Sequence, residues 1–217
     1  APGFHRALAA DLPRPLGILN IGGVANLTWI GTGGWGAFDT GPGNALLDDW
    51  VASHGLGRFD RGGQLARVGR VREDVLTSML DLPWFDRAGP KSLDRDDFSL
   101  AAVRGLAAED GAATLAAFTA ETVAIALRNL PERPLRLLVT GGGRHNPAIM
   151  AALASRTGCA VAPVEAEGWQ GDALEAQAFA WLAVRHVRGL PGSWPDTTGC
   201  RHPVVPGRLA DPVAESC

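Results

Sequence analysis

The sequence predicts an α/β fold, because apolar strands alternate with glycine-rich turns and helices. Two apolar runs flank Gly22-Gly23 and predict a β-hairpin. A third apolar run reaches Asp39 and leads through a turn into a helix from Ala45. A fourth run, residues 135–140, enters three consecutive glycines ahead of a helix that begins near Asn146. Strand, turn and helix in this order are typical of α/β proteins, whose reacting groups lie at strand ends.

The hairpin around Gly22 and Gly23 is a candidate phosphate site. Glycine has no Cβ, so the backbone N–H groups of such a turn are open to an anion at close range. Asn20 and Asn26, on the two strands beside the turn, add side-chain donors. The alternative is an ordinary hairpin connection, since glycine turns are common connectors.

Asp39 is the candidate catalytic residue. We expect it to end a short strand beside Thr40-Gly41-Pro42-Gly43-Asn44, an irregular turn that opens a helix. Reacting carboxylates of α/β proteins occupy such positions. The alternative is a turn former whose carboxylate bonds to its own backbone.

The run Gly141-Gly142-Gly143 is a second candidate for nucleotide binding. It lies between an apolar strand and a helix for which Asn146 is suited to the cap and Pro147 to the first position. Open N–H groups and the helix dipole would both favour an anion there. The run lacks the ending of a Walker loop and is not a clean dinucleotide fingerprint. His145 is expected to be a solvated loop residue.

Lys91 is the only lysine among the 20 basic residues of the chain, since all the others are arginine. A compact ammonium differs chemically from a planar guanidinium, so the exception indicates a specific task rather than a generic positive charge. Chance is the alternative, because one residue is a small sample.

Glu175 lies in the first turn of the last predicted helix, which spans about residues 173–187. It shares a helix face with Phe179 and Leu182, and we expect that face to be the buried one. Asp172-Ala173-Leu174-Glu175 also has the spacing of a capping box. One role open to Glu175 is therefore to close the start of its helix.

Composition and charge argue against several classes of protein. Hydrophobic residues make up 46% and charged residues 20%, and 217 residues suffice for one large domain or for one lobe with additions. The net charge of −3 argues against nucleic acid as a partner. Neither a membrane span nor a secretion signal is indicated. Cys159, Cys200 and Cys217 have no metal-ligand spacing, so we expect reduced thiols in a cytoplasmic protein.

Six motifs occur in a fixed order along nearly the whole chain. They are NIGGVANLT, AFDTGPGNALLDDW, GPKS, LLVTGGGRHNPAIMAAL, EAQAFAWLAVR and GLPGSWPDTTG. In this order they resemble the C-terminal part of the anhydro-N-acetylmuramic acid kinases, of the sugar-kinase, Hsp70 and actin superfamily. The resemblance runs from about Pro2 to Gly207. It implies a ribonuclease H-like (actin-like ATPase) lobe, with a mixed sheet and flanking helices.

The resemblance also implies an activity. It is the ATP-dependent phosphorylation of 1,6-anhydro-N-acetylmuramic acid, with Mg²⁺ and with opening of the anhydro ring by water, in peptidoglycan recycling. Residues 1–217 would form the C-terminal lobe, and the family's N-terminal lobe with the first phosphate loop has no counterpart here. The alternative is a non-catalytic nucleotide- or sugar-binding module derived from the kinase. The apolar helices would serve a homodimer face or a core equally well.

Site roles follow from the resemblance, position by position. Asp39 would be the general base that activates the attacking water. Contact with ATP would fall to Gly22, Gly23, Asn26, Gly141, Gly142 and Gly143, and contact with the sugar to Asn20, Lys91 and Glu175. No residue stands out as a dedicated metal ligand. After the lysine the family usually shows Ser-Thr-Gly-Arg-Glu, whereas this chain has Ser92-Leu93-Asp94-Arg95-Asp96, so its sugar contacts in that loop are expected to differ.

Overall fold

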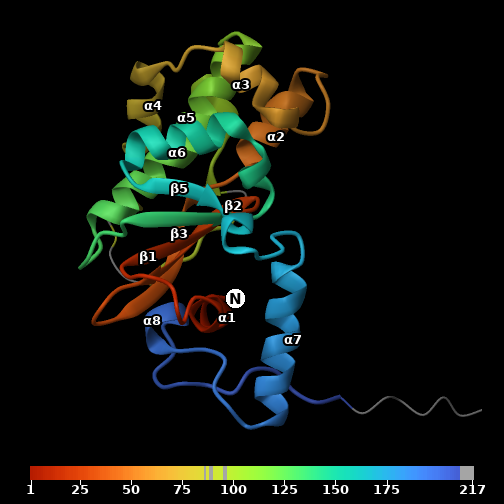
Figure 1. Cartoon of the computed structure of the whole chain (residues 1–217). Coiled ribbons are helices and arrows are strands. Elements are labelled where there is room, and N and C mark those ends of the chain that lie inside the picture. The colour runs from red at the N-terminus through yellow and green to blue at the C-terminus, as the bar shows by residue number, and fades with distance from the viewer. Residues whose placement is uncertain (86, 88–89, 95–96, 211–217) are drawn as a thin grey trace, which may run out of the picture.

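A five-stranded mixed sheet organises the structure, a computed structural model that describes residues 1–85, 87, 90–94 and 97–210 (Figure 1). Its strands are β1 (Leu16–Ile21), β2 (Val24–Ile30), β3 (Trp35–Pro42), β4 (Arg136–Thr140) and β5 (Ala160–Pro163). The strand order is β3-β2-β1-β4-β5. β2 runs antiparallel to β1 and β3, whereas β1, β4 and β5 run parallel. This is the ribonuclease H-like arrangement, and it confirms the predicted fold class.

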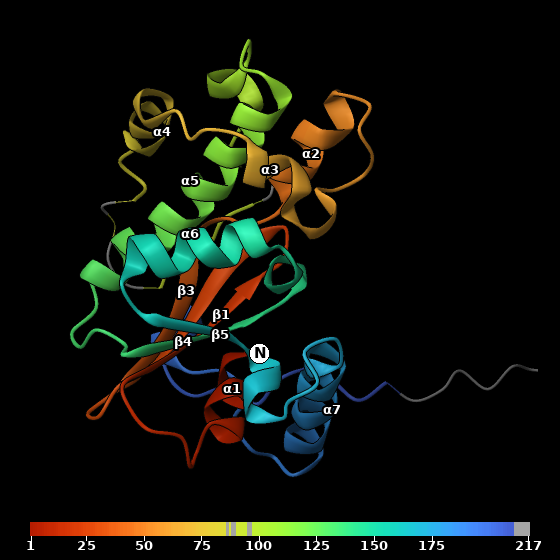
Figure 2. The same cartoon turned by 45° about the horizontal axis from the view of Figure 1, so that its top comes forward.

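Helices cover both faces of the sheet (Figures 1 and 2). α5 (Ala108–Arg128) and α6 (Pro147–Thr157) lie on one face, and α1 (Pro2–Leu8) and α7 (Leu174–Val187) lie on the other. The remaining α-helices are α2 (Ala45–Ser53), α3 (Gln64–Val68), α4 (Glu73–Leu80) and α8 (Pro195–Thr198). Short 3₁₀ turns are η1 (Arg61–Gly63), η3 (Leu100–Val103), η4 (Gly142–His145) and η5 (Val164–Glu167).

The alternation of side chains along each strand divides the core in two. Leu19 and Ile21 of β1 join the large cluster under α5 and α6, while Ile18 joins a smaller cluster with Leu138 and the residues of α1. The smaller cluster covers only part of its sheet face. The polar residues at the carboxyl ends of β1 and β4 are therefore left beyond the cover of α1.

α5 forms the centre of the larger cluster. By length and hydropathy alone it would suffice to cross a membrane, but 83% of that stretch is buried inside the fold. Burial on nearly all sides is the pattern of a core helix. α5 is therefore a core helix of this lobe.

A β-bulge extends the strand that contains Asp39. The sequence predicted that this strand ends at Asp39, which is wrong, because β3 continues to Pro42. Asn26 pairs with Asp39 while the neighbouring Ala25 pairs with Gly41, so Thr40 is the extra residue. The Thr40 hydroxyl donates to the carbonyl of Ala25 at 3.2 Å, which holds the bulge in place.

The Gly22-Gly23 turn is fastened to the start of α2. The N–H of Gly43 donates to the carbonyl of Gly23 (2.9 Å), and the N–H of Asn44 donates to that of Gly22 (2.7 Å). The Asn44 amide also donates to the carbonyl of Ile21 at 2.9 Å. A Cβ on Gly43 would lie 2.3 Å from the Gly22 oxygen, so only glycine allows this approach. The turn is thus held rigidly at the sheet edge.

The C-terminal segment packs against α7 and the sheet. Ser193 forms a β-bridge with Val204, and α8 lies between them in the chain. Trp194 meets the ring of Trp35 edge-on, with centroids 5.2 Å apart. The C-terminal segment therefore contains a short helix and contacts β3 through Trp194.

Two expectations concern the cysteine thiols and the loop that contains Lys91. Cys159 and Cys200 are free, as predicted. Cys217, Gly89 of the GPKS motif, Arg95 and Asp96 lie outside the described residues.

Candidate active site

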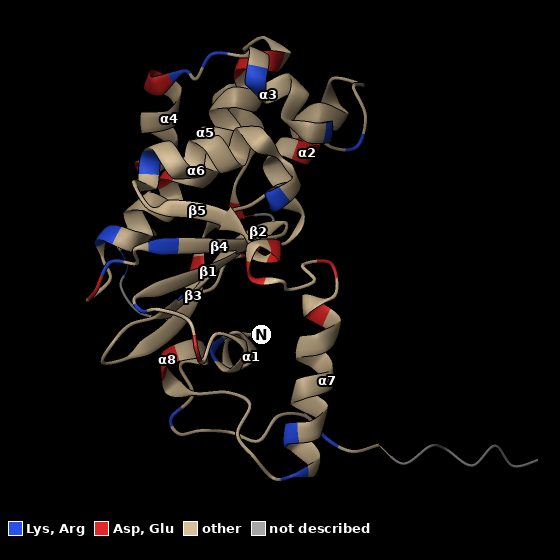
Figure 3. Ribbon diagram, viewed as in Figure 1, with Lys and Arg blue, Asp and Glu red and all other residues tan. Residues whose placement is uncertain are grey.

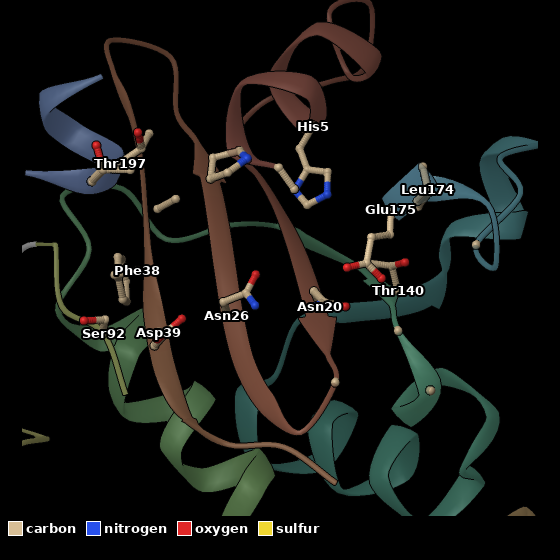
Figure 4. A pocket seen from close by; sticks show the side chains of 18 of the residues that line it. His5, Asn20, Asn26, Phe38, Asp39, Ser92, Thr140, Leu174, Glu175 and Thr197 are labelled. Atoms are coloured by element: carbon tan, nitrogen blue, oxygen red, sulfur yellow. The ribbon is translucent and has the colours of Figure 1, made fainter. Parts of the chain in front are cut away.

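Four polar side chains form a row across the sheet, here called the polar row. Asn20 pairs with Asn26 and with Thr140, and Asn26 pairs with Asp39, so the four residues stand at one level on four neighbouring strands. Paired residues point to the same face of a sheet, and strands lie about 4.8 Å apart. The polar row therefore spans about 14 Å. Figure 4 shows its side chains projecting into one cavity.

That cavity has a volume of about 830 Å³, within the usual range for a small-molecule site. The polar row forms its floor. Its walls come from the N-terminal half of α1, the loop from Pro90, the glycines after β4, the start of α7 and α8. Segments from the whole chain thus converge on one cavity, as in an active site built on an α/β sheet.

Asp39 is anchored on both its backbone and its side chain. Its N–H donates to the carbonyl of Lys91 (2.9 Å), and the N–H of Leu93 donates to its Oδ2 (2.8 Å). Burial raises the pKa of Asp39, and the hydrogen bond from Leu93 offsets part of that rise. A half-buried carboxylate of raised pKa is a stronger proton acceptor than an exposed one.

The Lys91 ammonium lies at the edge of the cavity, over an aromatic ring. Its Nζ is 4.1 Å from the centroid of the Trp84 ring, and it donates to the carbonyls of Trp84 and Phe85 at 3.3 Å each. These contacts hold the loop that fixes Asp39. Lys91 also lines the cavity, so the predicted contact with a sugar stays a prediction.

The predicted nucleotide residues fall into two groups. Gly22, Asn26, Gly141 and Gly142 line the cavity. Gly23 and Gly143 do not: the Gly23 carbonyl accepts from the start of α2, and a Cβ on Gly143 would lie 2.4 Å from Ile21. The contacts of Gly23 and Gly143 are therefore packing contacts outside the cavity.

The start of α6 is closed to a ligand. The Asn146 Oδ1 accepts from the N–H groups of Ala148 (3.0 Å) and Ile149 (3.3 Å), which confirms the predicted cap. The 3₁₀ turn η4 begins at Gly142 and ends directly before this cap. The idea that the α6 N-terminus itself receives an anion therefore does not fit, because its first N–H groups are already bonded.

Arg144 joins the glycine loop to the start of α7. Its guanidinium is only 4% exposed and donates to the Gly141 carbonyl (2.9 Å), to Glu165 (2.9 Å) and to Asp172 (2.6 Å). Burial by itself would lower the pKa of Arg144, but the hydrogen bonds to Asp172 and Glu165 outweigh it and raise the pKa. Arg144 therefore stays charged and fixes two walls of the cavity to each other.

The capping-box role of Glu175 is wrong. The cap residue of α7 is Ala173, and no side chain caps the helix. Asp172, the expected cap, instead accepts from Arg144. Glu175 is exposed and lines the cavity, which leaves its carboxylate available to a ligand (Figure 4). His145, as predicted, is a largely exposed loop residue, 3.6 Å from Asp172.

Thr140, His5 and Arg144 also line the cavity and were not candidates from the sequence. Thr140 ends β4, and its place directly before the glycines could have shown it. His5 is 4% exposed, and its Nδ1 lies 2.9 Å from the Thr28 hydroxyl. Burial lowers the pKa of His5 to about 4, so its ring is neutral at neutral pH. Neither His5 nor Arg144 stands in a pattern that predicts its position.

Fold and site together define a lobe of the ribonuclease H-like class with a polar cavity at the carboxyl ends of its parallel strands. A protein-family model described as anhydro-N-acetylmuramic acid kinase matches residues 1–211. The chain belongs to the anhydro-N-acetylmuramic acid kinase family.

Curated relatives with that name are similar along nearly the whole chain. The one from Acidiphilium cryptum is 57% identical over 216 residues, which are 98% of this chain and 60% of the relative. Those from Rhodospirillum rubrum and Rhizorhabdus wittichii are 57% and 53% identical over 208 residues, 95% of this chain and 56% and 57% of the relatives. The chain thus spans less than two thirds of the length of these relatives.

A solved structure is also similar, though only weakly. It is an activator of 2-hydroxyisocaproyl-CoA dehydratase from Clostridium difficile with bound ADPNP, 16% identical, with a TM-score of 0.47 over 84% of this chain and 67% of that chain. A likeness at this level supports no inference about ligands.

The raised pKa of Asp39 makes a prediction about stability. A carboxyl whose pKa is higher in the folded than in the unfolded state costs stability above the folded pKa, and the cost disappears below the unfolded value. Asp39→Asn should therefore raise the free energy of unfolding at pH 7, by at most about 1 kcal/mol because solvent screens a half-buried group. The gain should vanish as the pH falls toward 4.

Urea unfolding of both proteins at pH 7 and pH 4 measures this difference. Asp11→Asn, at an exposed aspartate outside the cavity, is the control for loss of a negative charge. An Asp39→Asn protein that is less stable than the parent at pH 7, or whose gain grows toward pH 4, would show that burial does not dominate at Asp39.

Proposed function

We propose that the chain is the C-terminal lobe of an ATP-dependent kinase that phosphorylates 1,6-anhydro-N-acetylmuramic acid and opens its anhydro ring with water. Residues 1–217 supply the nucleotide side and part of the sugar side. A second lobe with a further phosphate loop lies in the part of the relatives that this chain does not span. The reaction belongs to peptidoglycan recycling and takes place in the cytoplasm.

The observation that supports this proposal most directly is the alignment of the polar row. Asp39 stands at one end of the row and Thr140 with the glycine loop at the other. Because about 14 Å separate these ends, a sugar beside Asp39 and a nucleotide phosphate beside the glycines fit on one floor. A phosphoryl transfer needs this arrangement, with acceptor and donor held in line.

The sugar is bound above the polar row, between Asp39 and the start of α7. Asn20 offers both a donor and an acceptor, and the Glu175 carboxylate accepts hydrogen bonds from hydroxyl or amide groups. Lys91 adds a positive charge at the rim. These groups suit an acetamido sugar with several hydroxyls. The neutral ring of His5 closes the same region from α1.

The phosphates are bound at the two glycine turns. Gly22, Gly141 and Gly142 present backbone without side chains to the cavity, and Asn26 adds a side-chain amide from β2. Gly23 and Gly143 hold these turns from behind. Since Asn146 closes the start of α6, the backbone of the loop itself meets the anion.

Asp39 acts as the general base. The Leu93 N–H holds its Oδ2, and the Lys91 carbonyl fixes its backbone, so the carboxylate has one orientation. Its raised pKa improves it as an acceptor for the proton of the attacking water. The proton moves to the Asp39 carboxylate as the water oxygen bonds to the anomeric carbon and the anhydro C–O bond breaks. The oxygen released from the anhydro bridge takes the γ-phosphoryl group of ATP, and ADP leaves.

Magnesium enters with the nucleotide phosphates, whose charge it neutralises. Among the described residues, no group of three or more His, Cys, Asp or Glu side chains is placed to hold a metal ion. The chain therefore offers no dedicated set of metal ligands in its described part, and no step performed by its residues depends on one.

A phosphate-transfer assay on 1,6-anhydro-N-acetylmuramic acid tests the proposal. The full-length protein should convert the sugar to a phosphorylated product with an opened ring, whereas residues 1–217 alone should turn over little, because one lobe cannot clamp both substrates. Transfer to other amino sugars at equal rate would contradict the substrate. Robust turnover by residues 1–217 would contradict the need for a second lobe.

Replacement of Glu175 separates contact with the sugar from a structural role. Glu175→Gln keeps the shape but removes the charge, so kcat/KM for the sugar should fall about tenfold or more, the scale of one charge-assisted hydrogen bond. Thermal stability should hardly change, because Glu175 is exposed and caps nothing. Steady-state kinetics and a thermal melt of the full-length protein give both values. Unchanged kinetics would remove Glu175 from the sugar site.

A further inference from the structure

α7 is apolar on two opposite faces, and only one of them is covered in this structure. The covered face includes Leu174 and Ala178, the only buried residues of the helix. Trp181 lies on the same side, 6.3 Å from the Phe4 ring of α1. Figure 2 shows α7 standing beside α1, on the side of the sheet away from α5 and α6.

The other face of α7 is exposed along its whole length and contains no charge. Its residues recur at the three- and four-residue spacing of one helix face: Ala176, Phe179, Ala180, Ala183, Val184 and Val187. We call this set the outer stripe. Phe179, Val184 and Val187 are 65%, 51% and 77% exposed. In Figure 3 no charged residue interrupts α7 between its first and last turns.

The outer stripe overturns one expectation from the sequence. Phe179 was expected on the buried side of the helix with Glu175, yet it is mostly exposed. Only two of the 14 side chains of α7 are buried, so most of the helix surface stays uncovered in this structure. A continuous apolar stripe of this kind marks a surface that another segment covers.

We propose that the outer stripe docks the part of the full-length kinase that lies outside residues 1–217. This inference rests on family membership and not on the proposed reaction. About 40% of the length of the relatives is not spanned by this chain, which is enough for a further domain. The stripe begins one residue after Glu175, so the segment that covers it also borders the open cavity.

The size of the outer stripe favours a tethered segment over a second copy of the chain. A helix of 14 residues is about 21 Å long and about 10 Å wide, so one face offers roughly 200 Å². A stable complex between separate molecules needs about 800 Å² on each partner. A segment of the same polypeptide works at an effective concentration in the millimolar range, so a small face suffices.

Hydrogen exchange of α7 tests the docking. In the full-length protein the amides of residues 176–187 should exchange at least about tenfold more slowly than in residues 1–217 alone, because covering the stripe suppresses local opening. Phe179→Lys should abolish this extra protection in the full-length protein. In residues 1–217 the same change should leave the thermal midpoint nearly unchanged, since Phe179 is exposed there and lysine is a good helix former.

A matched pair of valines provides the control. Val187 and Val68 each end a helix and are 77% and 73% exposed. Val187→Lys should reduce the protection of α7 in the full-length protein, whereas Val68→Lys should not. Val187→Lys also serves as the milder variant if Phe179→Lys prevents expression of the full-length protein.

Two results would overturn the docking. One is equal exchange of α7 in the long and short chains. The other is a dimer of residues 1–217 that Phe179→Lys dissociates, which would assign the stripe to a second copy. The readout does not depend on catalysis: a full-length protein with a protected α7 and no phosphate transfer would contradict the proposed function and leave the docking intact.

Discussion

The register between four strands is the constraint on which the site depends. Asn20, Asn26, Asp39 and Thr140 reach one cavity only because each is paired with its neighbour across the sheet. The period of a strand is two residues, so a slip by one residue would turn an entire strand's polar side chains into the core under α5. The bulge at Thr40 fixes the register between β2 and β3. Hydrogen bonds from Gly43 and Asn44 hold the hairpin turn between β1 and β2.

A second constraint joins the walls of the cavity above this floor. The buried guanidinium of Arg144 bonds to the glycine loop and, through Asp172, to the start of α7. Any movement of α7 would therefore be transmitted to the loop proposed to hold the phosphates. A lobe that covers the outer stripe would contact the same helix directly. Domain closure and assembly of the site would then be one event, as phosphoryl transfer in a dry cavity requires.

Much of the floor of the cavity was predictable from the sequence. Asn20 and Asn26 flank the Gly22-Gly23 turn, and Thr140 ends an apolar run. The pairing of Asn20 with Asn26 is centred on Gly23, and only the structure shows that register. The walls were not predictable, because Arg144 finds its carboxylates 21 and 28 residues away. The local spacing of Asp172 and Glu175 suggested a cap, but the stronger charge-assisted bond to Arg144 removes Asp172 from it. Periodicity also failed at Phe179, because α7 is apolar on both sides and the pattern cannot say which side this lobe buries.

The kinetics of Asp39→Asn in the full-length protein test the central claim most directly, since the claim is that the polar row places a general base beside the sugar. Asparagine keeps the shape and can still accept the Leu93 N–H, but it cannot take the proton from water. The account predicts that kcat falls by roughly 10² to 10⁴ while ATP binding changes little. A kcat close to that of the parent protein would contradict it and would place the base elsewhere.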